Sequence, residues 1–87
     1  MQNKYNTMQF PCEFPIKAMG LNTETFQSAV RAIIQKHVST SEVIYSSQPS
    51  GGNKYISITA TFTAQSKVQL DALYLELNAH ELVLMTL

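Results

Sequence analysis

The sequence has few of the residues that usually carry chemistry or cross-links. Its one cysteine, Cys12, excludes an internal disulfide and a cysteine-rich zinc site, and it fits a reducing compartment. We expect Cys12 to fill space as a small apolar residue, because no histidine is assured beside it to activate the thiol. No Gly-x-Ser-x-Gly stretch occurs, and Gly51-Gly52 joins two expected strands instead of opening a helix. We therefore expect no enzyme, no catalytic residues and no cofactor.

Charged residues are also scarce. Six Lys and Arg balance six Asp and Glu, and charged residues make up only 14% of the chain. A nucleic-acid-binding domain normally shows a basic excess or stripe, and none is visible. No apolar run reaches the length of a membrane span, and no signal-peptide pattern is present. We expect a cytoplasmic, soluble protein whose sparsely charged surface favours self-association or a protein partner.

The length of 87 residues provides one small domain. Residues 1–10 are polar and aperiodic, so we expect an N-terminal arm that is ordered only where it docks. Residues 11–87 are expected to form the domain itself.

The clearest strand signal covers residues 55–63, because apolar and polar residues alternate there with a period of two. The apolar set predicted to face the core is Ile56, Ile58, Ala60 and Phe62. Turn residues 50–53 precede this strand, and residues 43–47 are its predicted hairpin partner. Residues 14–19 form a shorter first strand that has Pro15 near its start and that Gly20 ends.

Two segments have helical spacing. In the first, Asn22 is the predicted N-cap, and Leu21 and Phe26 have the spacing of a hydrophobic staple. Its inward residues are expected to be Phe26, Val30, Ile33, Ile34 and His37. Residues 39–41 are expected to close this helix.

The second helix is predicted over residues 66–77, with Asn78 as a left-handed terminator. Its inward stripe is expected to be Leu70, Leu73, Tyr74 and Leu77. Residues 81–87 then read as a last strand. One face of that strand should carry Val83, Met85 and Leu87, and the other Leu82, Leu84 and Thr86.

The order strand, helix, strand, strand, helix, strand, together with right-handed crossovers, predicts an α+β ferredoxin-like two-layer sandwich. The expected sheet order is 4-1-3-2, with both helices on one face. We expect antiparallel pairing except between the first and third strands.

Several stretches together resemble the YbeD family of small bacterial proteins. They are FPIKAMG (14–20), QKH (35–37), SGGN (50–53), ISIT (56–59), ALYLEL (72–77) and VLMTL (83–87). The resemblance covers residues 10–87. It implies a ferredoxin-like fold similar to ACT regulatory domains, no established activity, and a link to lipoate attachment through neighbouring genes. The sequence departs from the family pattern at Leu75 and Leu84, where charged residues are usual, and near residues 65–67.

The resemblance also suggests a ligand site. In ACT-like proteins the first strand–helix loop helps to hold an amino acid, and the matching residues here are Met19, Gly20, Leu21 and Asn22. We expect residues 20–23 and 63–66 to share one pole beside both helix N-termini, where backbone N–H groups favour anions. The alternative is structural, with Gly20 permitting a tight turn and Asn22 capping the helix.

His37 and His80 end the two helices, which we expect to be roughly parallel. Both imidazoles would then share the other pole with Glu42, Glu81 and the turn at residues 50–53. Such a group could bind a divalent metal, but capping of the helix C-termini is the favoured interpretation, so no metal is predicted.

The sheet face away from the helices is the predicted interface. Its candidate residues are Lys17, Tyr55, Ser57, Thr59, Leu82 and Leu84. A second apolar stripe runs along the outer side of the second helix through Val68, Ala72, Leu75 and Ala79. Two functions stay open. One is a regulatory or sensing module that couples a small-molecule effector to homo-oligomerisation or to a partner enzyme. The other is a ligand-free adaptor acting through the open sheet face.

Overall fold

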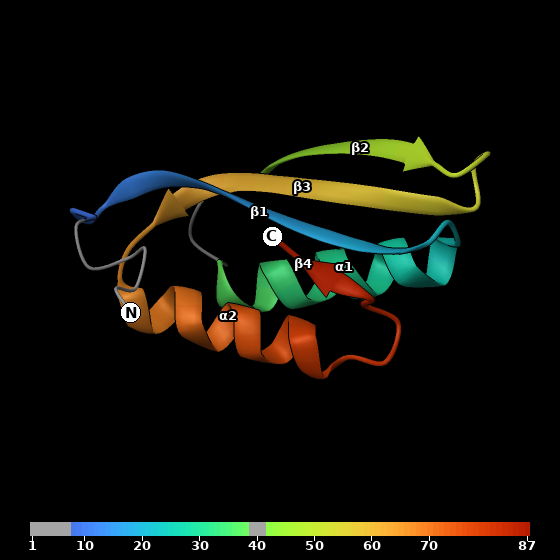
Figure 1. Cartoon of the computed structure of the whole chain (residues 1–87). Helices are drawn as coiled ribbons and strands as arrows, with labels where there is room; N and C mark the ends of the chain where they lie inside the picture. Colours follow the sequence, from blue (N-terminus) through green and yellow to red (C-terminus); the bar gives the residue numbers. More distant parts are fainter. Residues whose placement is uncertain (1–7, 39–41) are drawn as a thin grey trace.

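Two helices cover one face of a four-stranded sheet, and no part of the chain that the structure describes covers the opposite face (Figure 1). This computed structural model describes residues 8–38 and 42–87. The elements follow the expected order: β1 (Cys12–Leu21), α1 (Glu24–His37), β2 (Ile44–Ser50), β3 (Tyr55–Ala64), α2 (Lys67–Ala79) and β4 (Met85–Thr86). The predicted closure of the first helix at residues 39–41 lies outside the described residues. The ferredoxin-like α+β sandwich is therefore confirmed.

The sheet order is β2-β3-β1-β4, which is the predicted order read from the other edge. The expectation of parallel pairing between the first and third strands was wrong, because β1 and β3 pair antiparallel over ten residues. Each helix returns the chain to the end of the sheet where the preceding strand began. The direct hairpin between β2 and β3 reverses the chain once more, so β3 runs against both of its neighbours.

The hairpin turn sets the register of β2 on β3. Gly51, Gly52 and Asn53 all have positive φ, at 58°, 64° and 70°. Glycine and asparagine adopt this left-handed region most readily, which explains the SGGN stretch between the strands. The resulting register places Ser50 opposite Tyr55, Gln48 opposite Ser57, and the rest of β2 in step.

The core lies between the sheet and the helices. Every inward position predicted for β3 is buried, and Ile58 is only 2% exposed. Alternation along the strands and 3.6-residue periodicity along the helices therefore identified the core, except that His37 and Tyr74, which were also predicted to face inward, are only partly buried. The buried set is Phe14, Ile16, Ala18, Phe26, Val30, Ile33, Ile34, Val38, Ile56, Ile58, Ala60, Phe62, Ala64, Leu70, Leu73 and Leu77. Met8 and Phe10, from the expected arm, pack partly buried against it.

The helix ends differ from the predicted ones by a residue or two. Thr23, not Asn22, is the N-cap of α1, and its hydroxyl accepts a hydrogen bond from the Phe26 N–H at 3.1 Å. With Thr23 as the N-cap, Asn22 and Gln27 occupy the two positions of a hydrophobic staple, so Leu21 and Phe26 do not have the predicted staple spacing. Asn78 lies inside α2, which ends at the C-cap His80 with an extended backbone, so the predicted left-handed terminator was also wrong.

β4 is shorter than expected and its two faces are exchanged. It pairs with β1 only at Ala18–Thr86 and Met19–Met85. Directly paired residues share a face, so Met85 lies on the open side with Met19, while Thr86 lies on the helix side. There the Thr86 hydroxyl donates to the Asn78 side-chain oxygen at 3.0 Å. A shift of one residue in register exchanges the two faces of a strand, and this is the difference observed.

The first strand extends past its predicted end. Gly20 lies inside β1, opposite Ile56. A residue without a Cβ fits there, because the ring of Phe26 and the backbone of Leu82 occupy the space beside its Cα. Pro15 can lie inside β1 because its backbone nitrogen, which has no hydrogen to donate, faces a side of the strand where β4 does not pair with it. The Lys17 N–H and C=O bond Leu87 on the β4 side, and Pro15 faces the same side two residues earlier, beyond the pairing with β4.

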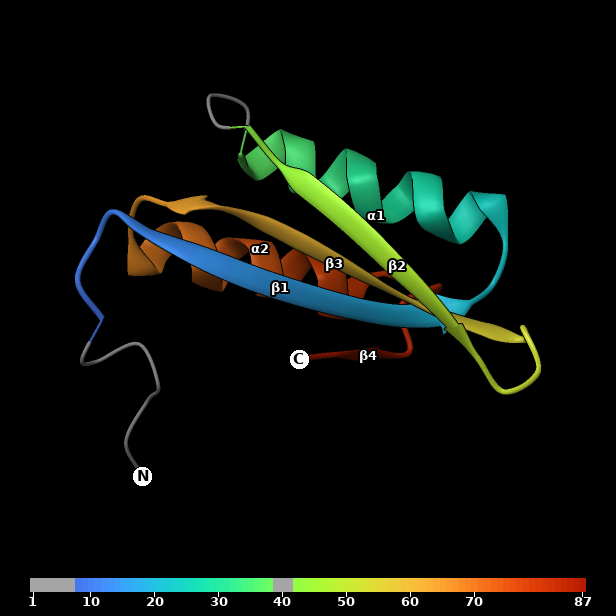
Figure 2. The same cartoon turned by 90° about the horizontal axis from the view of Figure 1, so that it is seen from above.

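The antiparallel pairing of β1 and β3 also changes which loops and helix ends lie at the same end of the sheet. The β1–α1 connection lies beside the hairpin turn, since the Asn22 N–H donates to the Lys54 carbonyl at 2.9 Å. The end of β3 lies at the other end of the sheet, where Ala64 pairs with Cys12. The two helices consequently run antiparallel (Figures 1 and 2), and their N-termini do not share a pole as expected.

Candidate binding surface

The open face of the sheet carries a hydroxyl-rich layer of side chains from three strands. Pairing with β3 places the outward residues of β1 and β2 on either side of Ser57 and Thr59. β4 adds Met85 beside Met19, and the backbone of Leu87 bonds that of Lys17. The outward residues on the three long strands include Lys17, Met19, Ile44, Ser46, Gln48, Ser50, Tyr55, Ser57, Thr59 and Thr61.

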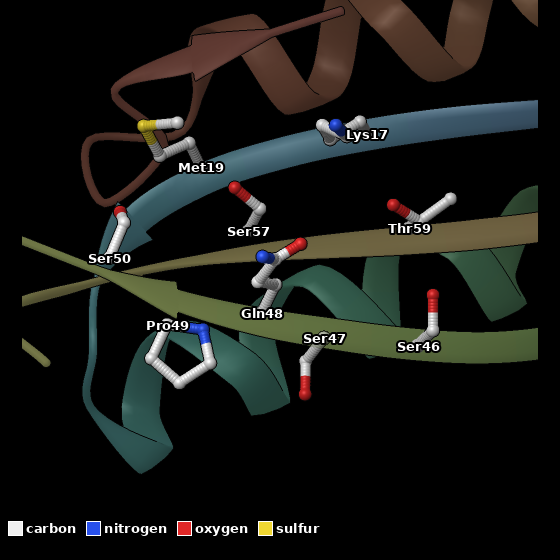
Figure 3. A pocket seen from close by; sticks show the side chains of 9 residues that line it. All are labelled: Lys17, Met19, Ser46, Ser47, Gln48, Pro49, Ser50, Ser57 and Thr59. Atoms are coloured by element: carbon white, nitrogen blue, oxygen red, sulfur yellow. The ribbon is translucent and has the colours of Figure 1, made fainter.

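These side chains form a shallow trough of about 370 Å³ over β3 (Figure 3). Its floor is made by the short side chains of Ser57 and Thr59. Longer side chains stand on the flanking strands, with Lys17 and Met19 on β1 and Gln48 on β2. The concave shape therefore follows from small residues on the central strand between larger residues on its neighbours.

The trough carries a single positive charge. Lys17 is the one charged residue among those that line it, and its ammonium makes no ion pair with any described residue. The carboxylate nearest to it along β1 is Glu13, which lies at the far end of the sheet, opposite Thr63. Lys54 adds a second cation close to the open face, 5.5 Å from the ring centroid of Tyr55. An anion is therefore the charge type that this surface attracts.

Four of the six predicted interface residues lie on this face: Lys17, Tyr55, Ser57 and Thr59. The placement of Leu82 there was wrong, because it precedes β4 and packs against the core. Leu84 also precedes β4, and its side chain is 59% exposed.

Sequence reasoning missed the contributions of β2 and β4 to this face. The register of the hairpin would have assigned Ser46 and Gln48 correctly, since each shares a face with its partner on β3. No comparable signal exists for Met85, because residues 82–85 are apolar on both faces.

Of the four residues suggested for ligand binding, only Met19 lines the trough. Gly20 has no free space beside it, because a Cβ there would lie 2.5 Å from the Phe26 ring and 2.7 Å from the Leu82 carbonyl oxygen. Leu21 ends β1 and is 46% exposed. Asn22 is engaged by the protein itself: its amide donates to the Asn53 carbonyl at 3.1 Å, and its side-chain oxygen accepts from Gln27 at 3.4 Å.

The two histidines have separate structural partners. His37 contacts Glu76 at 2.7 Å, which links the end of α1 to α2. His80 accepts a hydrogen bond from the Leu82 N–H at its Nδ1, at 3.1 Å. The expectation that both imidazoles share a pole was wrong, because the helices are antiparallel. Among residues 8–38 and 42–87, no three His, Cys, Asp or Glu side chains lie close enough to hold a metal ion.

The contact between the helices also changes one titration. Hydrogen bonds from His37 and Lys36 hold the pKa of the Glu76 carboxyl below its usual value of 4.5. These groups lie on the helix layer, on the other side of the sheet from the trough. They stabilise the packing of α1 on α2 and contribute nothing to the chemistry of the open face.

Two other side chains, those of Cys12 and Tyr45, carry groups that can be reactive in proteins. Cys12 is half-buried at the start of β1, and its thiol makes no hydrogen bond to any described residue. Tyr45 lies under α1, where burial raises the pKa of its hydroxyl, and the nearby Gln35 and Arg31 offset part of that rise. The Arg31 guanidinium lies 5.3 Å from the centroid of the Tyr45 ring. Within the part of the chain that the structure describes, neither group has the base and orienting partner that nucleophilic catalysis needs.

The fold and this surface define a class: a ferredoxin-like domain with both helices on one face of its sheet. Two solved structures share the fold. Protein HP0495 from H. pylori has a TM-score of 0.73 at 14% identity, covering 97% of this chain and 89% of that one. The C-terminal domain of the MgtC protein from Mycobacterium tuberculosis has a TM-score of 0.71 at 17% identity, covering 93% and 89%.

Sequence comparison identifies the family. Residues 5–87 match the family described as "Protein of unknown function (DUF493)". A UPF0250 protein from Shewanella woodyi is 45% identical over 74 residues, which are 85% of this chain and 83% of that protein. A UPF0250 protein from Chromobacterium violaceum is 34% identical over 97% of this chain and 96% of its own length. The chain belongs to this family of small bacterial proteins, the YbeD family that its motifs resemble.

The lengths and compositions of the two helices can be compared with those of membrane-spanning helices. Neither α1 nor α2 has both the length and the apolar composition that a membrane-crossing helix requires, within the part of the chain that the structure describes.

Proposed function

We propose that the protein is a small regulatory module that acts by docking onto another protein through the open face of its sheet, and not by catalysis. The observation that carries this proposal is a sheet face that none of the described helices or loops covers. A polar trough occupies its centre, and partly exposed apolar side chains stand beside it at Met19 and Met85, the latter 50% exposed. A polar centre with scattered apolar contacts is typical of interfaces that form and dissociate.

The edges of the sheet are less suited to docking. Pro49 lies in the edge strand β2, and Pro15 lies in the part of β1 that β4 leaves uncovered. Proline removes a backbone donor, and its presence on an edge opposes pairing with another strand. β4 offers only two strand residues. The face therefore supports docking better than strand addition does.

The charge on this face favours a different protein over a second copy of the chain. A symmetric dimer centred on the trough would bring two Lys17 ammonium groups together, and like charges at an interface oppose association. A partner with a carboxylate opposite Lys17 and apolar side chains opposite Met19 and Met85 would complement the surface. The family resemblance makes an enzyme of lipoate attachment the first partner enzyme to test.

The experiment compares two arginine substitutions. Thr59→Arg fills the trough, whereas Val68→Arg places the same side chain on the outer side of α2, at a residue that is 78% exposed. We expect a partner captured from the source cells to be retained by the wild type and by Val68→Arg, and lost with Thr59→Arg. Binding of that partner in purified form must reproduce the order, and the melting temperatures show that both variants are folded.

Three outcomes would contradict the proposal. The wild type could retain no partner, Thr59→Arg could bind as well as the wild type, or Val68→Arg could abolish binding. The last result would assign docking to the helix layer. Light scattering on the same samples tests the homodimer, and a dimer that Thr59→Arg dissociates would replace the partner protein with a second copy.

A small-molecule effector is a second candidate function. The free volume and the unpaired charge lie in the trough and not beside residues 20–22, where the protein occupies its own space. The site suggested by the ACT resemblance is therefore supported less well than the trough.

A further inference from the structure

The trough has the size of a small-ligand site. Its volume of about 370 Å³ lies within the roughly 300–1,000 Å³ typical of pockets that hold small molecules. It is a shallow depression in the sheet surface, so a ligand would keep part of its own surface in water. Such a shape suits a polar molecule better than an apolar one, because burying little apolar area yields little free energy.

The polar groups in the trough are available to a ligand. The side chains of Ser46, Gln48, Ser57 and Thr59 make no hydrogen bond to any other described residue. Each serine or threonine hydroxyl can both donate and accept, and the glutamine amide can do the same with separate atoms. Four such side chains around one depression complement a ligand that carries several hydroxyl groups.

The single positive charge in the trough favours a ligand with one negatively charged group. The Lys17 ammonium is the single charge in the lining, and no carboxylate in residues 8–38 or 42–87 forms an ion pair with it. One ammonium matches a monoanion such as a carboxylate, and hydrogen bonds between charged partners are stronger than neutral ones. The Met19 side chain provides an apolar wall beside this charge, against which the carbon chain of a ligand can lie.

We infer that the trough binds a small polyhydroxylated carboxylate, with its carboxylate on Lys17 and its hydroxyl groups on Gln48, Ser57 and Thr59. The site also lies inside the proposed docking surface, so an occupied trough excludes a docked partner. That competition rests on the proposed function, whereas binding of the small molecule does not.

The test is an NMR titration of the ¹⁵N-labelled protein with gluconate, at ionic strength matched with sodium chloride. Sorbitol serves as the control, because it has a similar hydroxylated chain and no charge. We expect saturable shifts in the amide signals of Lys17, Gln48, Ser57 and Thr59 with gluconate, and a response to sorbitol that is weaker by about tenfold or more.

Two variants with the same loss of charge complete the test. Lys17→Met should weaken gluconate binding by about tenfold or more. Lys67→Met removes a lysine from α2, where it pairs with Asp71, and should bind gluconate as the wild type does.

Absence of saturable shifts with gluconate would overturn the inference, as would equal binding of sorbitol or unchanged binding by Lys17→Met. None of these results would contradict the proposed function, because the capture experiment tests it without any small molecule. A positive titration combined with a failed capture would keep the ligand site and remove the docking surface.

Discussion

The two faces of the same sheet carry very different side chains. On β3, Ile58 faces the helices and is 2% exposed, while its neighbour Thr59 faces the open side and lines the trough. No buried side chain in the described residues is polar or charged. The open face instead carries hydroxyls, the Gln48 amide and Lys17, with apolar side chains such as Met19 and Met85 among them. The comparison indicates that the helix face is built for stability, whereas the open face is free to serve binding.

The largest effect should come from shortening a side chain on the helix face. Ile58→Ala leaves a cavity in the core, which typically costs about 2–5 kcal/mol of unfolding free energy. Thr59→Ala, one residue further on the open face, should cost no more than about 1 kcal/mol, which is the span of strand propensities. Urea unfolding of both variants measures the difference. Equal losses would mean that the open face also contributes to the core.

A smaller loss is expected where β1 meets the start of α1. A Cβ at Gly20 would collide with the Phe26 ring and with the Leu82 carbonyl, which belongs to the backbone and cannot rotate away. Gly20→Ala should therefore cost about 1–3 kcal/mol, as overpacked sites do.

The matched control for Gly20→Ala is the same substitution in a Phe26→Leu background, which removes one of the two groups that a Cβ at residue 20 would meet. In a Phe26→Leu background the ring is gone and only the carbonyl contact is left, so the double variant should lose less stability than the sum of its single variants. Strict additivity in thermal unfolding would contradict the proposed clash.

The third effect depends on pH and belongs to the helix layer. The pKa of Glu76 is lowered by His37 and then by Lys36. Its ionised form therefore stabilises the folded protein at pH above the ordinary value of 4.5, and this contribution disappears as the pH falls through the lowered pKa. Glu76→Gln should thus be less stable than the wild type at neutral pH and equally stable in acid.

Urea unfolding from pH 7 down to pH 2 would measure this convergence. Asp71→Asn is the control, because Lys67 is the one ion-pair partner of Asp71 among the described residues and the pair lies on an exposed part of α2. Exposed pairs of this kind contribute about 0.3–0.5 kcal/mol. A gap between the wild type and Glu76→Gln that stays constant over the whole pH range would exclude the contribution of the His37–Glu76 contact.

The smallest effect on stability is expected at Lys17. Its side chain is exposed and unpaired among the described residues, so Lys17→Met should change the unfolding free energy by no more than about 0.5 kcal/mol. The same variant should lose gluconate binding. A large loss of stability in this variant would make Lys17 a structural residue and weaken the separation of the two faces.

Much of the fold could be predicted because local patterns and long-range packing agree. The alternation through Ile58 and Phe62 specifies a strand with one buried face, and the SGGN stretch specifies the reversal before it. Both helices were found within a residue or two for the same reason. Their apolar residues recur at 3.6-residue spacing and can be buried only against the strands.

The errors arose where one-dimensional patterns are compatible with more than one arrangement. Residues 82–85 are apolar on both sides, so either register of the last strand satisfies the alternation, and only its pairing with Met19 decides which face Met85 takes. The predicted poles failed because the direction of β1 relative to β3 was assigned wrongly. That error placed His37 and His80 together, although the structure joins His37 to Glu76 instead.

The order of the residues alone is enough to specify which segments become strands and helices. In the first and third strands and in both helices it also specifies which side chains face the core, because burial of apolar surface follows the periodicity of each element. The same alternation also predicted that Lys17, Ser57 and Thr59 point away from the core. Tertiary structure alone brought Met19, Gln48 and Ser46 to them from neighbouring strands and filled the space beside Gly20 with Phe26. The reason is that a trough is a property of strands placed side by side, and no single strand carries the register that aligns it with the next.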